Sequence, residues 1–193
     1  MENLAVFTRL ADVLPRLPEG FCSFIRVSPK DVPNPLQIDF SSTTNHNTTA
    51  SLSLVGYSVA PPKSFSIVTP YFVQATTYWR VNTSQFPPMH IELLLFDGHG
   101  KQEFSSIDFP ALSWCPTSTW KPGTILRVTS STLWIYNVPN GLAHVAIALL
   151  PYNASFGAIS SVAERLPLQK VKAPASVTPI EGANAIQLES FIK

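Results

Sequence analysis

Apolar and polar side chains alternate with a period of two along most of this chain from about residue 36 onward. In residues 52–59, Leu52 and Leu54 are separated by Ser53, and residues 71–81 form a run rich in β-branched and aromatic side chains. Successive side chains of a β-strand point to opposite faces, so this pattern predicts strands with one face on a shared apolar interior. The alternation therefore argues against a mainly helical fold.

Turn signals separate the predicted strands at a spacing of roughly 8 to 12 residues, which is typical of a sandwich or barrel. Residues 97–100 (DGHG) predict a hairpin, and the Asn-Gly pair at 140–141 predicts the last turn. We expect one all-β domain over residues 36–193, an antiparallel β-sandwich of the jelly-roll or Ig-like type. The predicted strands are 36–40, 52–59, 71–81, 89–96, 102–107, 124–129, 132–136, 142–150, 162–168 and 185–192.

The first 35 residues are predicted to form a short amphipathic helix followed by a proline-rich connector at 31–35. Leu4, Phe7 and Leu14 recur at helical spacing, and prolines end the segment. The apolar stripe needs a partner, so the helix either caps the sandwich or makes subunit contacts through these three side chains.

Only 13% of the residues are charged, and the formal net charge is +1. No run of Lys and Arg is long enough to follow a phosphate backbone, which argues against nucleic-acid binding. No window reaches the ~18 apolar residues of a membrane helix, so we expect no transmembrane segment. The N-terminus does not fit a signal peptide, although the neutral polar composition suits an extracellular or particle-forming protein.

The residues that could carry chemistry form no recognisable constellation. The two cysteines, Cys22 and Cys115, are expected to be buried free thiols, with a disulfide as the alternative. The four histidines lack the spacing of a metal site, and the DGHG segment is interpreted as a turn. A Gly-x-Ser-x-Gly motif is absent from the sequence. We therefore predict no catalytic residues, no metal site and no cofactor.

The tryptophans are the most informative side chains. Trp79 and Trp134 lie within predicted strands and are expected to belong to the core. Trp114 and Trp120 flank a Cys-Pro-Thr-Ser-Thr loop, where an exposed ring could stack on a sugar. Together with Tyr152 they are the predicted ligand-binding residues, for a glycan or a protein partner.

Six segments, at residues 54–57, 77–80, 91–100, 116–123, 139–141 and 165–168, resemble a known family in their order and spacing. The chain is similar to the β-sandwich domain at the C-terminal, extracytoplasmic end of membrane glycosyltransferase-like proteins in Chloroflexi-type bacteria. The resemblance covers about residues 36–192 and implies an accessory domain at the cell surface with no catalytic residues. Leu126-Arg127-Val128 stands where the family has an acidic residue, and 148–151 replaces a Gly-x-Tyr signature.

Two functions follow from these observations. The first is a non-catalytic binding or accessory module that recognises a glycan or another cell-envelope component through loop aromatics. The second is a structural subunit of a coat, filament or larger assembly, suggested by the low charge and the apolar N-terminal helix. A hydrolase with a dispersed site is a third, weaker hypothesis, since a fold does not fix a function.

Overall fold

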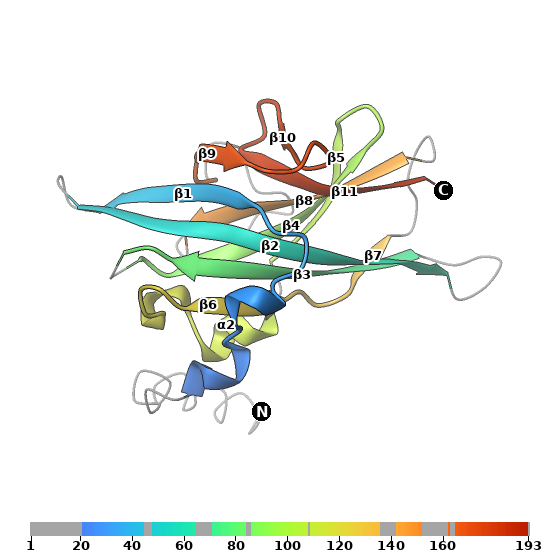
Figure 1. The fold of residues 1–193 in the computed structure, drawn as a ribbon. Helices are drawn as coiled ribbons and strands as arrows, with labels where there is room; N and C mark the ends of the chain where they lie inside the picture. Colours follow the sequence, from blue (N-terminus) through green and yellow to red (C-terminus); the bar gives the residue numbers. More distant parts are fainter. Residues whose placement is uncertain are drawn as a thin grey trace, which may run out of the picture.

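Two antiparallel β-sheets packed face to face form the body of the protein (Figure 1). The structure is a computed structural model. It describes residues 21–44, 48–64, 71–83, 86–107, 109–135, 142–151, 162 and 165–192. The predicted all-β sandwich is confirmed, whereas the predicted helix with Leu4, Phe7 and Leu14 lies outside the described residues.

The first sheet has the strand order β6-β3-β2-β1-β9, and β7 pairs with β3 beyond the end of β6. The second sheet has the order β10-β11-β8-β4-β5. The first sheet contains β1 (Gln37–Thr44), β2 (Thr48–Ser64), β3 (Tyr71–Val81), β6 (Ile125–Thr129), β7 (Leu133–Ile135) and β9 (Leu168–Lys172). The second contains β4 (Met89–Asp97), β5 (Gln102–Ser106), β8 (Leu142–Pro151), β10 (Thr178–Ile180) and β11 (Ala185–Ile192).

Short helical segments lie beside the first sheet. They are η2 (Phe21–Ile25), η3 (Pro29–Asp31), α2 (Pro110–Trp114) and η4 (Thr117–Thr119). The sequence pattern did not predict α2, because five residues are too few to show a helical period. The strand predicted over 162–168 is wrong: pairing begins only at Leu168, and Val162 lies in a helical turn.

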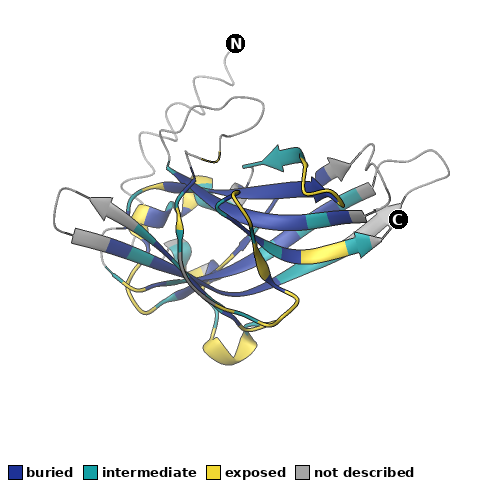
Figure 2. Ribbon diagram, turned by 90° about the horizontal axis from the view of Figure 1, so that it is seen from above, coloured by how far each residue is buried: buried dark blue, intermediate teal, exposed yellow. Residues whose placement is uncertain are grey.

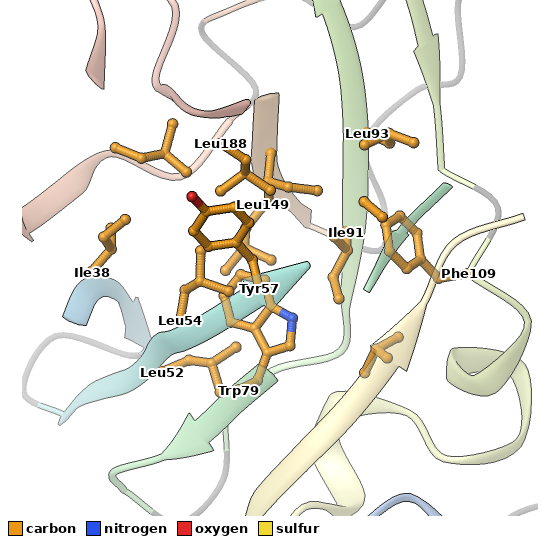
Figure 3. Close-up of a cluster of buried hydrophobic side chains, with 14 of the residues drawn as sticks. Ile38, Leu52, Leu54, Tyr57, Trp79, Ile91, Leu93, Phe109, Leu149 and Leu188 are labelled. Atoms are coloured by element: carbon orange, nitrogen blue, oxygen red, sulfur yellow. The ribbon is translucent and has the colours of Figure 1, made fainter. Parts of the chain in front are cut away.

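The main core lies between the sheets and is built from alternate residues of the central strands (Figure 3). Trp79 is fully buried there, as predicted, with its ring centroid 5.7 Å from that of Phe40. Its Nε1–H donates to Thr77 Oγ1 over 2.8 Å, so the polar atom of the ring is satisfied inside the core. Burial of this kind contributes roughly 25 cal/mol per Å² of apolar surface and stabilises the contact between the sheets.

The second sheet is also buried on its other face (Figure 2). Alternation places Leu94 and Phe96 there, opposite the face that carries Leu93 and Leu95. Strand β8 contributes Ala146 and Ala148 to this cluster, opposite Leu94 and Glu92 of β4. The apolar residues of this smaller cluster are Leu94, Phe96, Ala146, Ala148, Ala183 and Ala185.

A buried ion pair lies on this second face. Arg165 Nε donates to Glu92 Oε2 over 2.8 Å, and both side chains are at most 1% exposed. The same guanidinium donates to the Ala183 carbonyl over 2.9 Å and to Gln102 Oε1 over 2.7 Å. Arg165 therefore ties the chain that follows β8 to β4, to β5 and to the start of β11.

The connector at 31–35 crosses the outer face of the first sheet. Val32 and Val27 pack on a small apolar cluster there, made of Val55, Tyr78 and Ile125. The crossing requires a glycine at Gly56, because a Cβ there would clash with the Val32 side chain and lie 2.6 Å from the Pro33 carbonyl oxygen. The connector thus becomes part of the surface of the sandwich.

The predicted hairpin at 97–100 is confirmed as the turn between β4 and β5. Asp97 Oδ1 accepts hydrogen bonds from the main-chain N–H groups of Lys101 and His99, each over 2.9 Å. The Lys101 N–H, then the His99 N–H, hold the pKa of the Asp97 carboxyl below its ordinary value of 3.8, against the opposing effect of desolvation. Its carboxylate therefore stabilises the turn in its ionised form.

Replacement of Glu92 by Gln should destabilise the protein by about 3–5 kcal/mol, because the buried Arg165 guanidinium would lose its ion pair with Glu92. Urea unfolding at neutral pH measures the change. Glu103→Gln is the matched control, since Glu103 pairs with Lys101 at the surface, and it should have a far smaller effect. An equal effect of the two substitutions would contradict the role given to the buried pair.

Acid should weaken the protein in part through Asp97. Because the folded-state pKa of this carboxyl is lowered, its contribution is present above pH 3.8 and is lost as the pH falls through the lower folded-state value. Urea unfolding between about pH 2 and 6 should therefore show a shallower acid loss in Asp97→Asn than in the parent. Parallel pH profiles for the two proteins would disprove this.

Candidate functional site

The three predicted ligand-binding residues have different outcomes. Trp114 is 58% exposed at the end of α2. Trp120 is only 5% exposed, so the expectation that its ring is accessible is wrong. Tyr152 lies outside the described residues.

Trp120 is buried because the loop before it is fastened to β4. Thr117 Oγ1 donates to the Pro87 carbonyl over 2.7 Å and accepts from the Met89 N–H over 2.9 Å. The chain then turns through η4, and Trp120 Nε1–H donates to the Cys115 carbonyl over 2.9 Å. With its polar atom satisfied, the indole packs into the main core.

Cys22 and Cys115 form a disulfide, with their Cα atoms 5.7 Å apart, so the expectation of two free thiols is wrong. A domain of this size can build a hydrophobic core that is stable without a disulfide, so the length of the chain did not predict one. However, η2 and α2 lie outside the two sheets and have little core of their own. The disulfide fixes η2 to the residue that follows Trp114, and both elements pack against β6.

One recess on this side of the molecule is lined by two arginines, and we call it the arginine recess. It has a volume of about 290 Å³ and is open to solvent. Arg127 lies directly opposite Tyr78 in the β3–β6 pairing, and Arg26 bridges Leu126 at the outer edge of β6. Its lining residues are Arg26, Val27, Ser28, Asp31, Tyr78 and Arg127.

A second recess adjoins the first at Arg127, and we call it the hydroxyl recess. Its volume is about 480 Å³. The Ser130 main chain continues the pairing of β6 with Ala75, and the Gln74 amide donates to the Ser130 carbonyl over 2.9 Å. The lining residues are Ile25, Gln74, Ala111, Arg127, Thr129, Ser130, Ser131 and Thr132.

The two recesses together form what we call the β6 groove. Its walls come from η2, from the chain after η2, from β3, from β6 and from α2. Within the part of the chain that the structure describes, the hydroxyls of Ser131 and Thr132 make no hydrogen bond to another residue. The groove therefore offers guanidinium, hydroxyl and amide groups from β3, β6, the chain after β6 and the chain after η2, beside a helix that ends in an exposed indole.

The histidines that the structure describes lie apart from the groove. His144 Nδ1 lies 2.9 Å from Ser190 Oγ on the second sheet, His99 is in the β4–β5 turn, and His90 is in β4. Among the described residues, no three His, Cys, Asp or Glu side chains gather as metal ligands. A search of the same residues for a helix long and apolar enough to cross a bilayer also finds none.

Sequence reasoning missed Arg26 and Arg127 as site residues. Arg127 had a signal, because it interrupts an otherwise apolar strand between Leu126 and Val128 and so had to face outward. Arg26 had none, since its position beside β6 depends on pairing between distant segments.

Comparison of the chain with protein-family models, with curated proteins and with solved structures finds no match.

Loss of the disulfide should lower the free energy of unfolding by about 2–5 kcal/mol, because the cross-link closes a loop of about 93 residues. Denaturant unfolding of Cys22→Ser/Cys115→Ser against the parent measures the change. Dithiothreitol should weaken the parent to the level of the double variant and leave the variant unaffected. Equal stability of parent and variant under oxidising conditions would contradict the cross-link.

Proposed function

We propose that this protein is a non-catalytic binding module whose β6 groove and Trp114 recognise a glycan. The observation that carries the proposal is the position of the exposed Trp114 indole. It lies three residues after Ala111, which lines the hydroxyl recess, on the same short helix. Residues three apart on a helix are neighbours on its surface.

This arrangement suits the chemistry of a sugar. A pyranose has an apolar face that packs on an indole and a rim of hydroxyls that exchange hydrogen bonds with polar side chains. The hydroxyl recess supplies such partners in Ser131 and Thr132, next to the guanidinium of Arg127. Binding sites generally combine an apolar or aromatic surface with a few placed polar groups in this way.

One further observation supports a role outside the reducing cytoplasm, and the resemblance inferred from the sequence agrees with it. Disulfides form and persist mainly in oxidising compartments, and Cys22–Cys115 joins η2 to the residue after α2, two of the segments that wall the groove. The resemblance to extracytoplasmic accessory domains points to the same compartment. A cell-envelope or extracellular polysaccharide is therefore the class of partner we propose.

A glycan array followed by calorimetric titration of the best binder tests the proposal. Trp114→Ala should weaken binding by at least about 10-fold, which corresponds to about 1.4 kcal/mol. Val162→Ala is the matched control, because Val162 is also an exposed large apolar residue but does not line the groove. Its affinity should equal that of the parent.

Two results would overturn the proposal: no glycan bound by the parent, or equal affinities for the parent and Trp114→Ala. The competing hypothesis is a structural subunit of a coat, filament or larger assembly. Light scattering over a range of protein concentrations separates the two, since a subunit would assemble with increasing concentration and a binding module would keep one mass.

A further inference from the structure

We propose that the arginine recess binds an oxyanion substituent of the glycan, so that the preferred ligand is an acidic polysaccharide. The oxyanion is a uronate carboxylate or a sulfate ester, which share the same acceptor chemistry. This inference rests on the proposed function, because it names the chemical class of the glycan bound in the β6 groove.

The two guanidinium groups of the arginine recess are available to a ligand. Arg26 and Arg127 line one recess, yet neither side chain forms an ion pair or a hydrogen bond within the described residues. Arg165 shows the opposite arrangement, with its donors directed to a carboxylate, a carbonyl and an amide. Two cations that face one concave surface repel each other, and an anion between them would relieve that repulsion.

Tyr78 contributes a hydroxyl group to the same recess. Its side chain is only 8% exposed, packed with Val55 and Ile125, and it lines the same recess. The hydroxyl makes no hydrogen bond to another residue in the described ranges. The hydroxyl is not among the fully buried unpaired polar atoms of the described residues, so it opens into the recess. An acceptor on a ligand would take its hydrogen bond there in place of water.

Main-chain pairing holds the backbone around these groups in place before any ligand binds. Tyr78 and Arg127 are a directly opposed pair in β3 and β6. Arg26 is held by its bridge to Leu126, and the next N–H, that of Val27, donates to the Ile125 carbonyl over 2.9 Å. Only side chains need to become ordered on binding, which lowers the entropic cost of recognition.

The chemistry of the recess favours an oxyanion over a neutral group. A guanidinium donates two parallel hydrogen bonds to a carboxylate, sulfate or phosphate, a geometry that a sugar hydroxyl cannot match. Asp31 is the one carboxylate in the lining, so the recess keeps a net positive charge. The Asp31 carboxylate would also make the recess selective. It would accept hydrogen bonds from sugar hydroxyls next to the anionic group, and it would repel a second anion.

Paired probes that differ only in charge test this inference. Dextran sulfate is compared with dextran, and oligogalacturonate with its methyl ester, by calorimetric titration at about 0.05 M and about 0.5 M NaCl. The acidic member of at least one pair should bind more tightly, and the difference should shrink at the higher salt concentration. Which pair shows the effect distinguishes a sulfate from a carboxylate as the preferred group.

Arg127→Gln should reduce affinity for the preferred acidic probe by about 10- to 100-fold, the range expected for hydrogen bonds to a charged group. Lys172→Gln is the matched control, because Lys172 is an exposed cation in β9, at the opposite edge of the same sheet. It should bind like the parent. Circular dichroism and thermal unfolding confirm that both variants are folded.

The outcomes separate this inference from the proposed function. Equal affinity for the acidic and neutral members of both pairs, or equal losses in Arg127→Gln and Lys172→Gln, overturns the oxyanion site. In that case Trp114-dependent binding of neutral glycans would still support a glycan module. No binding of any probe, charged or neutral, overturns both.

Discussion

Face-to-face packing of the two sheets is the interaction on which the rest of the structure depends. Strands β2 and β3 present Leu52, Leu54 and Trp79 to Ile91, Leu93 and Leu149 of β4 and β8, and all six side chains are fully buried (Figure 3). Because side chains alternate along each strand, this inward set determines which residues of the same strands face outward. The position of Arg127 at the surface thus follows from the burial of Leu126 and Val128 beside it.

The groove is a consequence of how the first sheet ends. Strand β6 is an edge strand, and its outer side is partly covered by residues 26–27 and by α2 rather than by another full strand. The cover is incomplete, and the uncovered parts are the two recesses. The Cys22–Cys115 disulfide holds the two covering segments together, so it controls the shape of the groove without lining it.

The sequence predicted the sandwich because alternation and turn chemistry are local signals. Residues 71–81 and the hairpin at 97–100 could be read directly, since each depends only on its own neighbours in the chain. The burial of Trp79 followed from its place in the middle of a strand. These features persist in any arrangement of strands that closes over a common core.

The site could not be read in the same way, because it depends on contacts between distant segments. Trp120 was expected at the surface, yet the tether from Thr117 to the start of β4 turns it inward. The spacing of the two cysteines does not decide between free thiols and a disulfide, because η2 and α2 meet only in the folded chain. Arg165 belongs to one of the six segments of the resemblance. Its burial against Glu92 cannot be predicted from the sequence, because the two residues are far apart in the chain.

The most direct measurement is an amide and indole chemical-shift map of the intact protein during titration with a sulfated dextran oligosaccharide and, separately, with an oligogalacturonate. The account predicts that the perturbed signals cluster at residues 26–28, 111–114 and 127–132, together with the Trp114 indole N–H. Such a pattern would place the ligand on the β6 groove. Perturbations confined to the second sheet, around β10 and β11, or the absence of any shift at saturating oligosaccharide, would contradict the account.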